Sequence, residues 1–403
     1  MKKTLALVLA LAMLLMLAAC AASTPAATTD ASAAENTGTT AASEAATEEK
    51  PACVSGDTIK IGFSIPRTGN SAELGTNSYN SAMMALEEIN AAGGILGKPV
   101  ELVIEDSQND AKQAVEIAKR FISDDSILMT LTGDSSTCNI ACANYYQEAE
   151  MCLLAANASN AALTPMGDYI FSVAGRSTDE SPFSINGVIK DYMGVERLAI
   201  IYVNSDWGAG LYETEKELCK DAGIEIVAAE QFNEGETDFS SVISKMRKES
   251  PDAVLVVAQY AEGGLIVKQI RKSGWDVAIT TTGAVVNDDF LSFVGEDAEG
   301  ICGYAILTFS DAFPASMSFY NEYVSRFDRT PTIHATVYEG LKIIAEAANR
   351  CGDNLNRQSI REELAATKDF EGLNGPVTIE QDGNVSRLWQ VVKVQDGVWT
   401  KAD

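Results

Sequence analysis

Short apolar runs alternate with stretches of helical periodicity from residue 58 onward. The first run has an apolar residue at every second position, which predicts a strand. Its apolar residues are Ile59, Ile61, Phe63 and Ile65. Further strand-length runs follow at 100–104, 127–131 and 151–156, with helical spacing between them. Strands separated by helices of this length are typical of a parallel sheet that carries helices on both faces.

The same pattern restarts after Ser181. Strands are expected at 198–203, 224–229, 253–258 and 277–281, and helices at 211–221, 239–249 and 263–273. Two such series predict an α/β protein with two lobes, each built on its own parallel sheet. Ligands of open parallel sheets bind beyond the carboxyl ends of the strands, so the two lobes predict a hinged cleft. The last expected elements are helices at 315–327, 335–351 and 358–367 and a strand pair around 389–399.

The N-terminus has the order of an export signal. Lys2 and Lys3 precede an apolar run at 5–17, and small residues then lead to Cys20. The run is too short to span a bilayer. Ala18-Ala19-Cys20 resembles the bacterial lipobox, whose cysteine is diacylated and becomes the mature N-terminus; an ordinary signal peptide is the alternative. We therefore expect a signal peptide at 1–19 and a protein anchored through two acyl chains on Cys20.

Residues 20–56 are built mainly from Ala, Thr, Ser and Glu, and they contain no aromatic residue. Such a segment buries too little apolar surface to offset its ordering entropy, so we expect a disordered tether between the membrane and a folded body. The body is long enough for two domains of ordinary size. No other segment has the length and apolarity of a transmembrane helix.

Charge and cysteine content narrow the range of partners. The formal net charge is −27, which becomes −29 once the two lysines of the signal are removed (−27 minus +2). This excess argues against nucleic-acid binding and against a basic membrane-binding face. Cys138, Cys142 and Cys152 allow a metal site, but the spacing favours buried free thiols. No metal or cofactor is expected, and the single histidine, His334, is interpreted as structural.

Several ordered motifs carry a family resemblance. They are Ile59-Lys60-Ile61-Gly62, Pro66-Arg67-Thr68-Gly69, Glu88-Ile89-Asn90-Ala91-Ala92-Gly93-Gly94-Ile95-Leu96-Gly97, Glu105-Asp106-Ser107-Gln108-Asn109-Asp110, Asp206-Trp207-Gly208 and Lys268-Gln269-Ile270-Arg271. Together they resemble the branched-chain amino acid (leucine/isoleucine/valine-binding) class of solute-binding lipoproteins of ABC importers, which have the type I periplasmic binding protein fold. The likeness covers essentially all of residues 57–403.

The resemblance implies an interrupted domain order, with lobe one at 57–175 plus 305–380 and lobe two at 177–302 plus 381–403. It also implies a monomer outside the cytoplasm that captures a small molecule, delivers it to an ABC transporter membrane permease and is periplasmic if an outer membrane exists. The partners would then be the ligand, the permease and, through the lipid anchor, the membrane.

In family members a ligand carboxylate is held at two turns of lobe one. The matching residues here are Ser135, Ser136 and Thr137 in the first turn and Asn157, Ala158 and Ser159 in the second. Each turn follows an apolar strand, where a helix N-terminus and serine or threonine hydroxyls favour an anion. The alternative is that Ser136 and Ser159 are only helix N-caps.

The resemblance assigns the aromatic wall of the cleft to Trp207, where relatives usually have tyrosine, and to Tyr260. Gly283 occupies the position at which branched-chain amino acid binders carry an acid for the ligand ammonium. The candidates to replace that acid are Asp179, Glu180, Asp288 and Asp289. An amino acid is the leading ligand class, and an uncharged amide or a carboxylate without an ammonium group is the alternative.

The two rival function classes are an enzyme and a sensory binding protein. The sequence lacks a Gly-x-Gly-x-x-Gly loop in register, a Gly-x-Ser-x-Gly elbow and a His-Glu-x-x-His pair, so we expect no enzyme and no catalytic residues. The second alternative is a binding protein that passes its signal to a separate sensory receptor instead of delivering a ligand to a permease.

Overall fold

The computed structural model describes residues 56–307, 309 and 313–402. The predicted signal peptide, the lipidated Cys20 and the tether, apart from Gly56, lie outside the described residues. Within the described part, no helix has the length and apolarity needed to cross a membrane.

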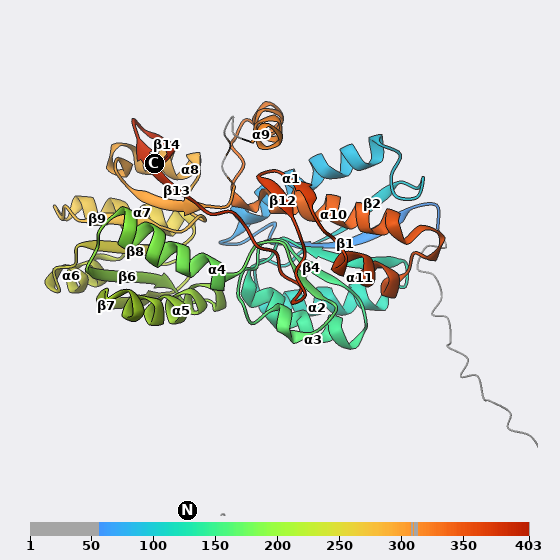
Figure 1. The fold of residues 1–403 in the computed structure, drawn as a ribbon, viewed down its shortest axis with the longest axis horizontal. Coiled ribbons are helices and arrows are strands. Elements are labelled where there is room, and N and C mark those ends of the chain that lie inside the picture. Colours follow the sequence, from blue (N-terminus) through green and yellow to red (C-terminus); the bar gives the residue numbers. More distant parts are fainter. Residues whose placement is uncertain (1–55, 308, 310–312, 403) are drawn as a thin grey trace, which may run out of the picture. The chain divides into compact units, whose positions relative to one another are not determined.

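The first lobe is built on an entirely parallel five-stranded sheet (Figure 1). Its strand order is β2 (Val100–Asp106), β1 (Ile59–Ile65), β3 (Ile127–Thr132), β4 (Leu153–Ala155) and β5 (Ile170–Ser172). One face packs against α1 (Ala72–Ala91), α10 (Thr336–Cys351) and α11 (Arg357–Ala365). The other packs against α2 (Ala111–Ser123) and α3 (Ser136–Glu148). Burying both faces explains why these strands read as nearly continuous apolar runs.

The second lobe has a seven-stranded sheet in which β13 runs antiparallel to both of its neighbours, β14 and β10, and the other neighbouring strands are parallel. The order is β14 (Val398–Lys401), β13 (Gln390–Gln395), β10 (Cys302–Ala305), β9 (Ala278–Thr281), β8 (Ala253–Val257), β6 (Arg197–Val203) and β7 (Glu225–Phe232). One face packs against α6 (Ser240–Lys248), α7 (Tyr260–Lys272) and α8 (Asp288–Val294). The other packs against α5 (Asp206–Ala222) and the π-helix η2 (Phe183–Tyr192). The α/β prediction of two lobes with parallel sheets is confirmed.

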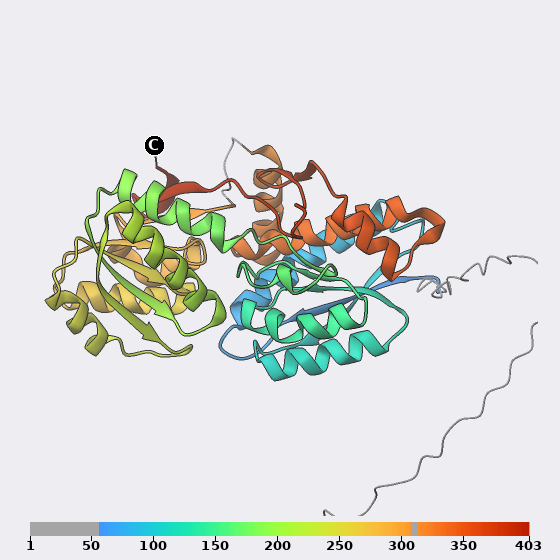
Figure 2. The same ribbon diagram turned by 60° about the horizontal axis from the view of Figure 1, so that its bottom comes forward.

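The remaining elements complete the described chain (Figure 2). They are η1 (Thr164–Met166), α4 (Ser177–Pro182), η3 (Gly295–Ala298), α9 (Pro314–Phe327), η4 (Ile333–Ala335), η5 (Gly352–Asn354), β11 (Phe370–Gly372) and β12 (Gly375–Val377). The chain changes lobes more than once. Ile379 and Val385 pack in the core of the first lobe, whereas the second sheet gains its last strands from Gln390 onward.

Two helices of the second lobe begin earlier than their apolar periodicity predicts. The Ser205 hydroxyl accepts a hydrogen bond from the Gly208 amide and caps α5, which therefore begins at Asp206. Helix α7 begins at Tyr260. Trp207 and Tyr260 thus lie in the first turns of helices rather than in the loops before them, because the first turn of a helix is often polar and carries little periodic signal.

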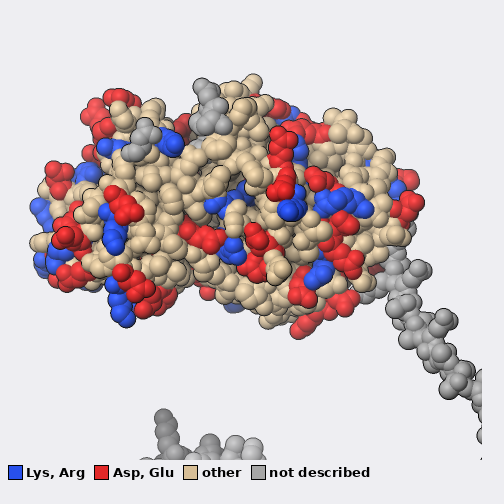
Figure 3. Space-filling model, viewed as in Figure 1, with Lys and Arg blue, Asp and Glu red and all other residues tan. Residues whose placement is uncertain are grey.

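The described cysteines are free thiols, and all except the half-buried Cys351 are buried. No group of three or more His, Cys, Asp or Glu side chains in the described ranges is placed to hold a metal ion. On the face shown in Figure 3, acidic side chains are spread between basic ones.

Candidate ligand-binding cleft

A pocket lies at the carboxyl ends of both sheets and takes residues from both lobes. Its lining includes six residues expected from the sequence: Ser135, Ser136, Asn157, Ser159, Trp207 and Tyr260. Three other expected residues, Thr137, Ala158 and Gly283, do not line it. The lining also contains acidic, amide and aromatic residues that the sequence did not assign to the site: Glu73, Asn77, Asn109, Glu234, Gln259, Glu262, Asn287, His334 and Trp389.

The first turn presents a helix N-terminus and a free hydroxyl to the pocket. Ser135 is the N-cap residue of α3, yet its hydroxyl makes no capping hydrogen bond. That hydroxyl is buried and has no partner among the described residues. The first amides of a helix also have no partner within the helix, and the helix dipole there favours an anion. The turn therefore offers several donors without a formal charge.

Buried side chains hold this turn in place. Asp134 is 2% exposed, and its carboxylate accepts hydrogen bonds from the hydroxyls of Ser64 (2.6 Å) and Ser107 (2.5 Å). Burial raises the pKa of Asp134 to about 6, although the two hydroxyls oppose that shift. These contacts join the ends of β1 and β3 to the segment that follows β2, so the turn is positioned by the sheet itself.

The second turn is tied to the first through Asn157. Its amide nitrogen donates to the Ser78 hydroxyl (2.9 Å) and to the Gly133 carbonyl (3.0 Å), and its amide oxygen accepts from the Thr336 hydroxyl (3.1 Å). Ser159 follows in a loop that leads to the short 3-10 helix η1, so no long helix begins at this turn. Asn157 thus fixes the turn, while Ser159 remains on the pocket wall.

Two expected residues have structural contacts instead. The Thr137 hydroxyl accepts a hydrogen bond from the Asp206 amide in the second lobe (3.1 Å). Ala158 is 1% exposed, and its carbonyl accepts from the Ser172 hydroxyl (2.8 Å). Asn160, in the same loop, donates to the Asp206 carbonyl (2.6 Å). Thr137 and Asn160 therefore join the two lobes at one edge of the pocket.

Gly283 faces the protein interior rather than the pocket. A Cβ atom placed on it would lie 3.1 Å from the Tyr304 carbonyl oxygen and 3.1 Å from Ile333 Cδ1. An acidic side chain at this position would have to displace backbone of β10. The pocket is lined instead by its neighbour, Ala284.

An acid does reach the pocket from another element. Glu180 on α4 lines the pocket and is 5% exposed. Burial raises the pKa of its carboxyl to about 7, and the nearby Tyr304 hydroxyl opposes the shift. Glu180 was one of four acids that the sequence offered as replacements at Gly283. Among those four, Asp179, Asp288 and Asp289 do not line this pocket.

The described lining of the pocket carries several acidic side chains but no lysine or arginine. The acidic residues are Glu73, Glu180, Glu234 and Glu262. His334 is on the wall, but burial lowers the pKa of its imidazole to about 4, so the ring is neutral at pH 7. Trp389 adds an indole nitrogen that is buried and unpartnered in the described part of the chain.

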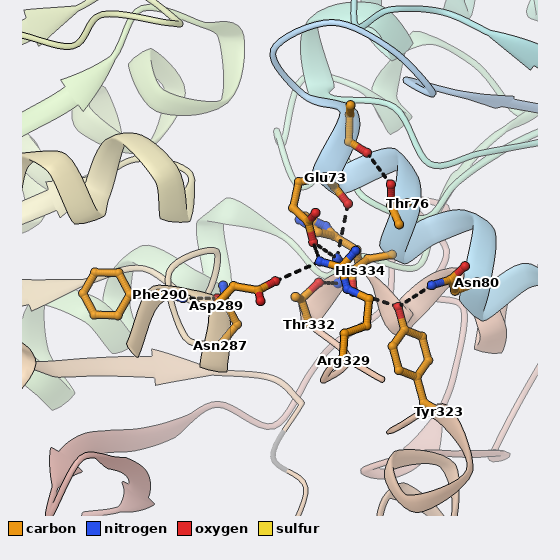
Figure 4. Close-up of polar contacts among 12 residues, drawn as sticks. Glu73, Thr76, Asn80, Asn287, Asp289, Phe290, Tyr323, Arg329, Thr332 and His334 are labelled. Atoms are coloured by element: carbon orange, nitrogen blue, oxygen red, sulfur yellow. Dashed lines mark hydrogen bonds and ion pairs between the residues drawn. The ribbon is translucent and has the colours of Figure 1, made fainter. Parts of the chain in front are cut away.

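Arg329 connects the two lobes at a second edge (Figure 4). Its guanidinium pairs with Glu73 on α1 of the first lobe and, at 2.8 Å, with Asp289 on α8 of the second. The Asn77 amide also donates to Glu73 (2.6 Å). Burial raises the pKa of Tyr260 beside this group to about 12, and the two carboxylates add to the shift. Cross-lobe contacts are thus present at both edges of the pocket.

Comparison with known proteins identifies the architecture. The profile of the family described as "Periplasmic binding protein" matches residues 58–398, which is most of the chain. The chain belongs to the periplasmic binding protein family. This family is extracytoplasmic, and its members named below bind solutes. The predicted resemblance to the branched-chain amino acid type is confirmed by the relatives described next.

Among periplasmic binding proteins, the leucine-, isoleucine-, valine-, threonine- and alanine-binding protein of Pseudomonas aeruginosa is 26% identical over 340 residues, covering 83% of this chain and 89% of the relative. LivJ, the substrate-binding protein of a branched-chain amino acid transporter from Streptococcus pneumoniae, was solved with isoleucine. It is 26% identical with a TM-score of 0.78, covering 86% of this chain and 100% of LivJ. A solute-binding protein from R. palustris solved with benzoate shares only the fold, at 15% identity and a TM-score of 0.79, over 85% of this chain and 95% of that protein.

Proposed function

We propose that this periplasmic binding protein captures a zwitterionic α-amino acid outside the cytoplasm and delivers it to an ABC importer. The observation that carries the ligand class is Glu180, a buried carboxyl on the pocket wall with no lysine or arginine among the described residues beside it in the lining. A buried carboxylate is costly without a partner, and a ligand ammonium supplies that partner. Glu180 would therefore replace the acid that is missing at Gly283.

The neutral donors of the first lobe suit the other end of such a ligand. The unpartnered Ser135 hydroxyl and the N-terminus of α3 would hold the carboxylate, with Ser136 and Ser159 beside them. The indole nitrogen of Trp389 is a further donor that lacks a partner among the described residues. A carboxylate held by hydroxyls and amides needs no lysine or arginine, which agrees with the composition of the lining.

The aromatic residues of the second lobe would cover the apolar part of the ligand. Trp207 and Tyr260 both line the pocket from the first turns of their helices. Leu74 and Ile306 supply aliphatic surface to the same pocket. An amino acid with an apolar side chain would therefore contact both lobes at once, and these added contacts would favour the closed arrangement.

Anchoring and delivery rest on other observations. The Ala18-Ala19-Cys20 ending of the export signal supports a lipid anchor on the outer face of the membrane. The transporter role of relatives such as LivJ supports an importer as the partner. In this proposal the protein is a monomer that binds and releases its ligand without chemical change.

A thermal-shift screen of the purified chain tests the ligand class. Any compound that binds only the native state raises the melting temperature by mass action. We expect a rise with L-leucine, L-isoleucine, L-valine or another α-amino acid, and no rise with benzoate or small amides at equal concentration. A rise with benzoate or an amide alone would contradict the proposal and favour an ammonium-free ligand. A pull-down of membrane partners with the purified protein tests the transport role. Recovery of a sensory receptor instead of a permease would contradict it.

A further inference from the structure

A second buried carboxyl lies close to Glu180. Glu215 on α5 is 0% exposed, and neither of its carboxyl oxygens has a hydrogen-bond partner among the described residues. The hydroxyls of Ser181, Ser184 and Tyr304 are also buried and unpartnered in the same part of the structure. These groups come from α4, the π-helix η2 and β10, which meet at the α4 end of the pocket.

The side-chain groups near Glu215 are acidic or uncharged. Glu180 faces it from α4, Ser184 from η2, Tyr304 from β10 and Cys219 from its own helix. No lysine, arginine or histidine is among the described groups that shift its pKa. Burial raises the pKa of Glu215 to about 8, and the nearby Glu180 carboxylate adds to the shift. Two ionised carboxylates in this environment would be strongly unfavourable.

We propose that Glu180 and Glu215 are an electrostatically coupled acid pair, in which Glu215 is a positioning residue that keeps its proton when a cationic ligand group occupies Glu180. In the empty protein near neutral pH, the pair holds at least one proton. When an ammonium group binds, Glu180 releases any proton it holds to solvent and remains as the carboxylate. Glu215 stays neutral, so no second buried charge opposes the carboxylate of Glu180.

The ligand-free part of this proposal stands independently of the proposed function, whereas the coupling to an ammonium group rests on it. The pKa of Glu215 is raised on folding, so the folded chain binds its proton over a pH range in which the unfolded chain has lost it. The stability associated with that proton is complete below the ordinary pKa of glutamate and is lost as the pH rises to about 8. Glutamine at this position has no proton to lose and removes that dependence.

The test compares melting temperatures of the full chain and its Glu215→Gln variant between pH 4 and pH 9, without ligand. We expect the variant to gain stability relative to the native chain as the pH rises, with the difference levelling off above pH 8. Glu217→Gln is the matched control, because Glu217 is exposed on the same helix. If the melting temperature of Glu215→Gln changes with pH in parallel with that of Glu217→Gln, the proposed pair is contradicted.

Two further measurements make the result independent of how well one variant folds. Infrared spectroscopy of the native chain at pH 7 should show a protonated carboxyl band that Glu215→Gln weakens; its absence would also overturn the pair. Calorimetry with L-leucine at pH 6 in two buffers of different ionisation enthalpy should show release of nearly one proton. Leucine binding without proton release would contradict the coupling to Glu180. Failure of leucine and of every other α-amino acid to bind, with the ligand-free profile as expected, would contradict only the proposed function.

Discussion

The turns of the first lobe and the α4 end of the pocket offer opposite groups to a ligand. At the turns, the Ser135 hydroxyl and the N-terminus of α3 are neutral donors. At the α4 end, Glu180 is a buried carboxyl with a second carboxyl, Glu215, close by. Donors without charge suit an anion, and an unpaired buried acid suits a cation. Under the proposed function, the two ends together would select for a molecule that carries both charges.

Removing the carboxyl group of Glu180 should have the largest effect on amino-acid affinity. Glu180→Gln keeps the size of the side chain but removes its charge, so it should weaken amino-acid binding by about 100-fold, as for loss of one partner of a buried charge pair. Titration calorimetry measures the change. Asp179→Asn is the matched control, because Asp179 is adjacent in sequence but pairs with Arg176 (3.0 Å) rather than lining the pocket. Equal losses in both variants would show that Glu180 is not the specific partner.

Removing donors from the other end should have the next largest effect. Ser135→Ala combined with Ser159→Ala should weaken amino-acid binding by about 30-fold, because hydrogen bonds to a charged group contribute about 1.5–3 kcal/mol each and some backbone donors remain. The same calorimetric titration applies. Unchanged affinity in this double variant would remove the assigned carboxylate site, whatever the result for Glu180→Gln.

Acid pH should weaken binding through Glu180 alone. Its pKa is about 7 in the empty protein, so protonation below that pH removes the partner of the ammonium group. Affinity should fall about fivefold between pH 7 and pH 6, approaching tenfold for each further unit. Fluorescence or calorimetric titrations over this range measure the slope. The dependence should disappear in Glu180→Gln; if it persists there, another group is responsible.

The cross-lobe ion pairs should have the smallest effect. Arg329→Met removes the contacts to Glu73 and Asp289 but leaves both ends of the pocket intact. Partly exposed ion pairs contribute little, so affinity should fall about threefold. Raising the salt concentration should reduce the native affinity towards that of the variant. A loss as large as that of Glu180→Gln would mean that lobe closure, rather than charge selection, dominates binding.

The fold could be predicted because its signals are local. Apolar runs and helical spacing follow from burial of both sheet faces, and Asp110 caps α2 through the Lys112 and Gln113 amides as its position suggests. The first-lobe serines were assigned through the family resemblance, and the structure places Ser135, Ser136 and Ser159 on the pocket wall a few residues after buried strands. Helix starts such as Tyr260 were missed by a few residues because polar first turns carry little periodicity.

The acidic end of the pocket could not be derived in this way. Glu180 lies on a six-residue helix, and its burial depends on packing against α5 and β10, which are distant in sequence. The family resemblance pointed to Gly283, which does not line the pocket, and its tight contact with Tyr304 and Ile333 is also non-local. No pattern in the sequence around Arg329 indicates that this residue bridges the two lobes.

The most direct measurement is a calorimetric comparison of L-leucine with its two single-charge analogues, 4-methylpentanoate and 3-methylbutylamine, at pH 7.5. The first analogue lacks the ammonium group and the second lacks the carboxylate, while the branched side chain is unchanged. We predict that leucine binds at least about 100-fold more tightly than either analogue, because each loses one charged contact. Binding of 4-methylpentanoate as tight as that of leucine would contradict selection for both charges.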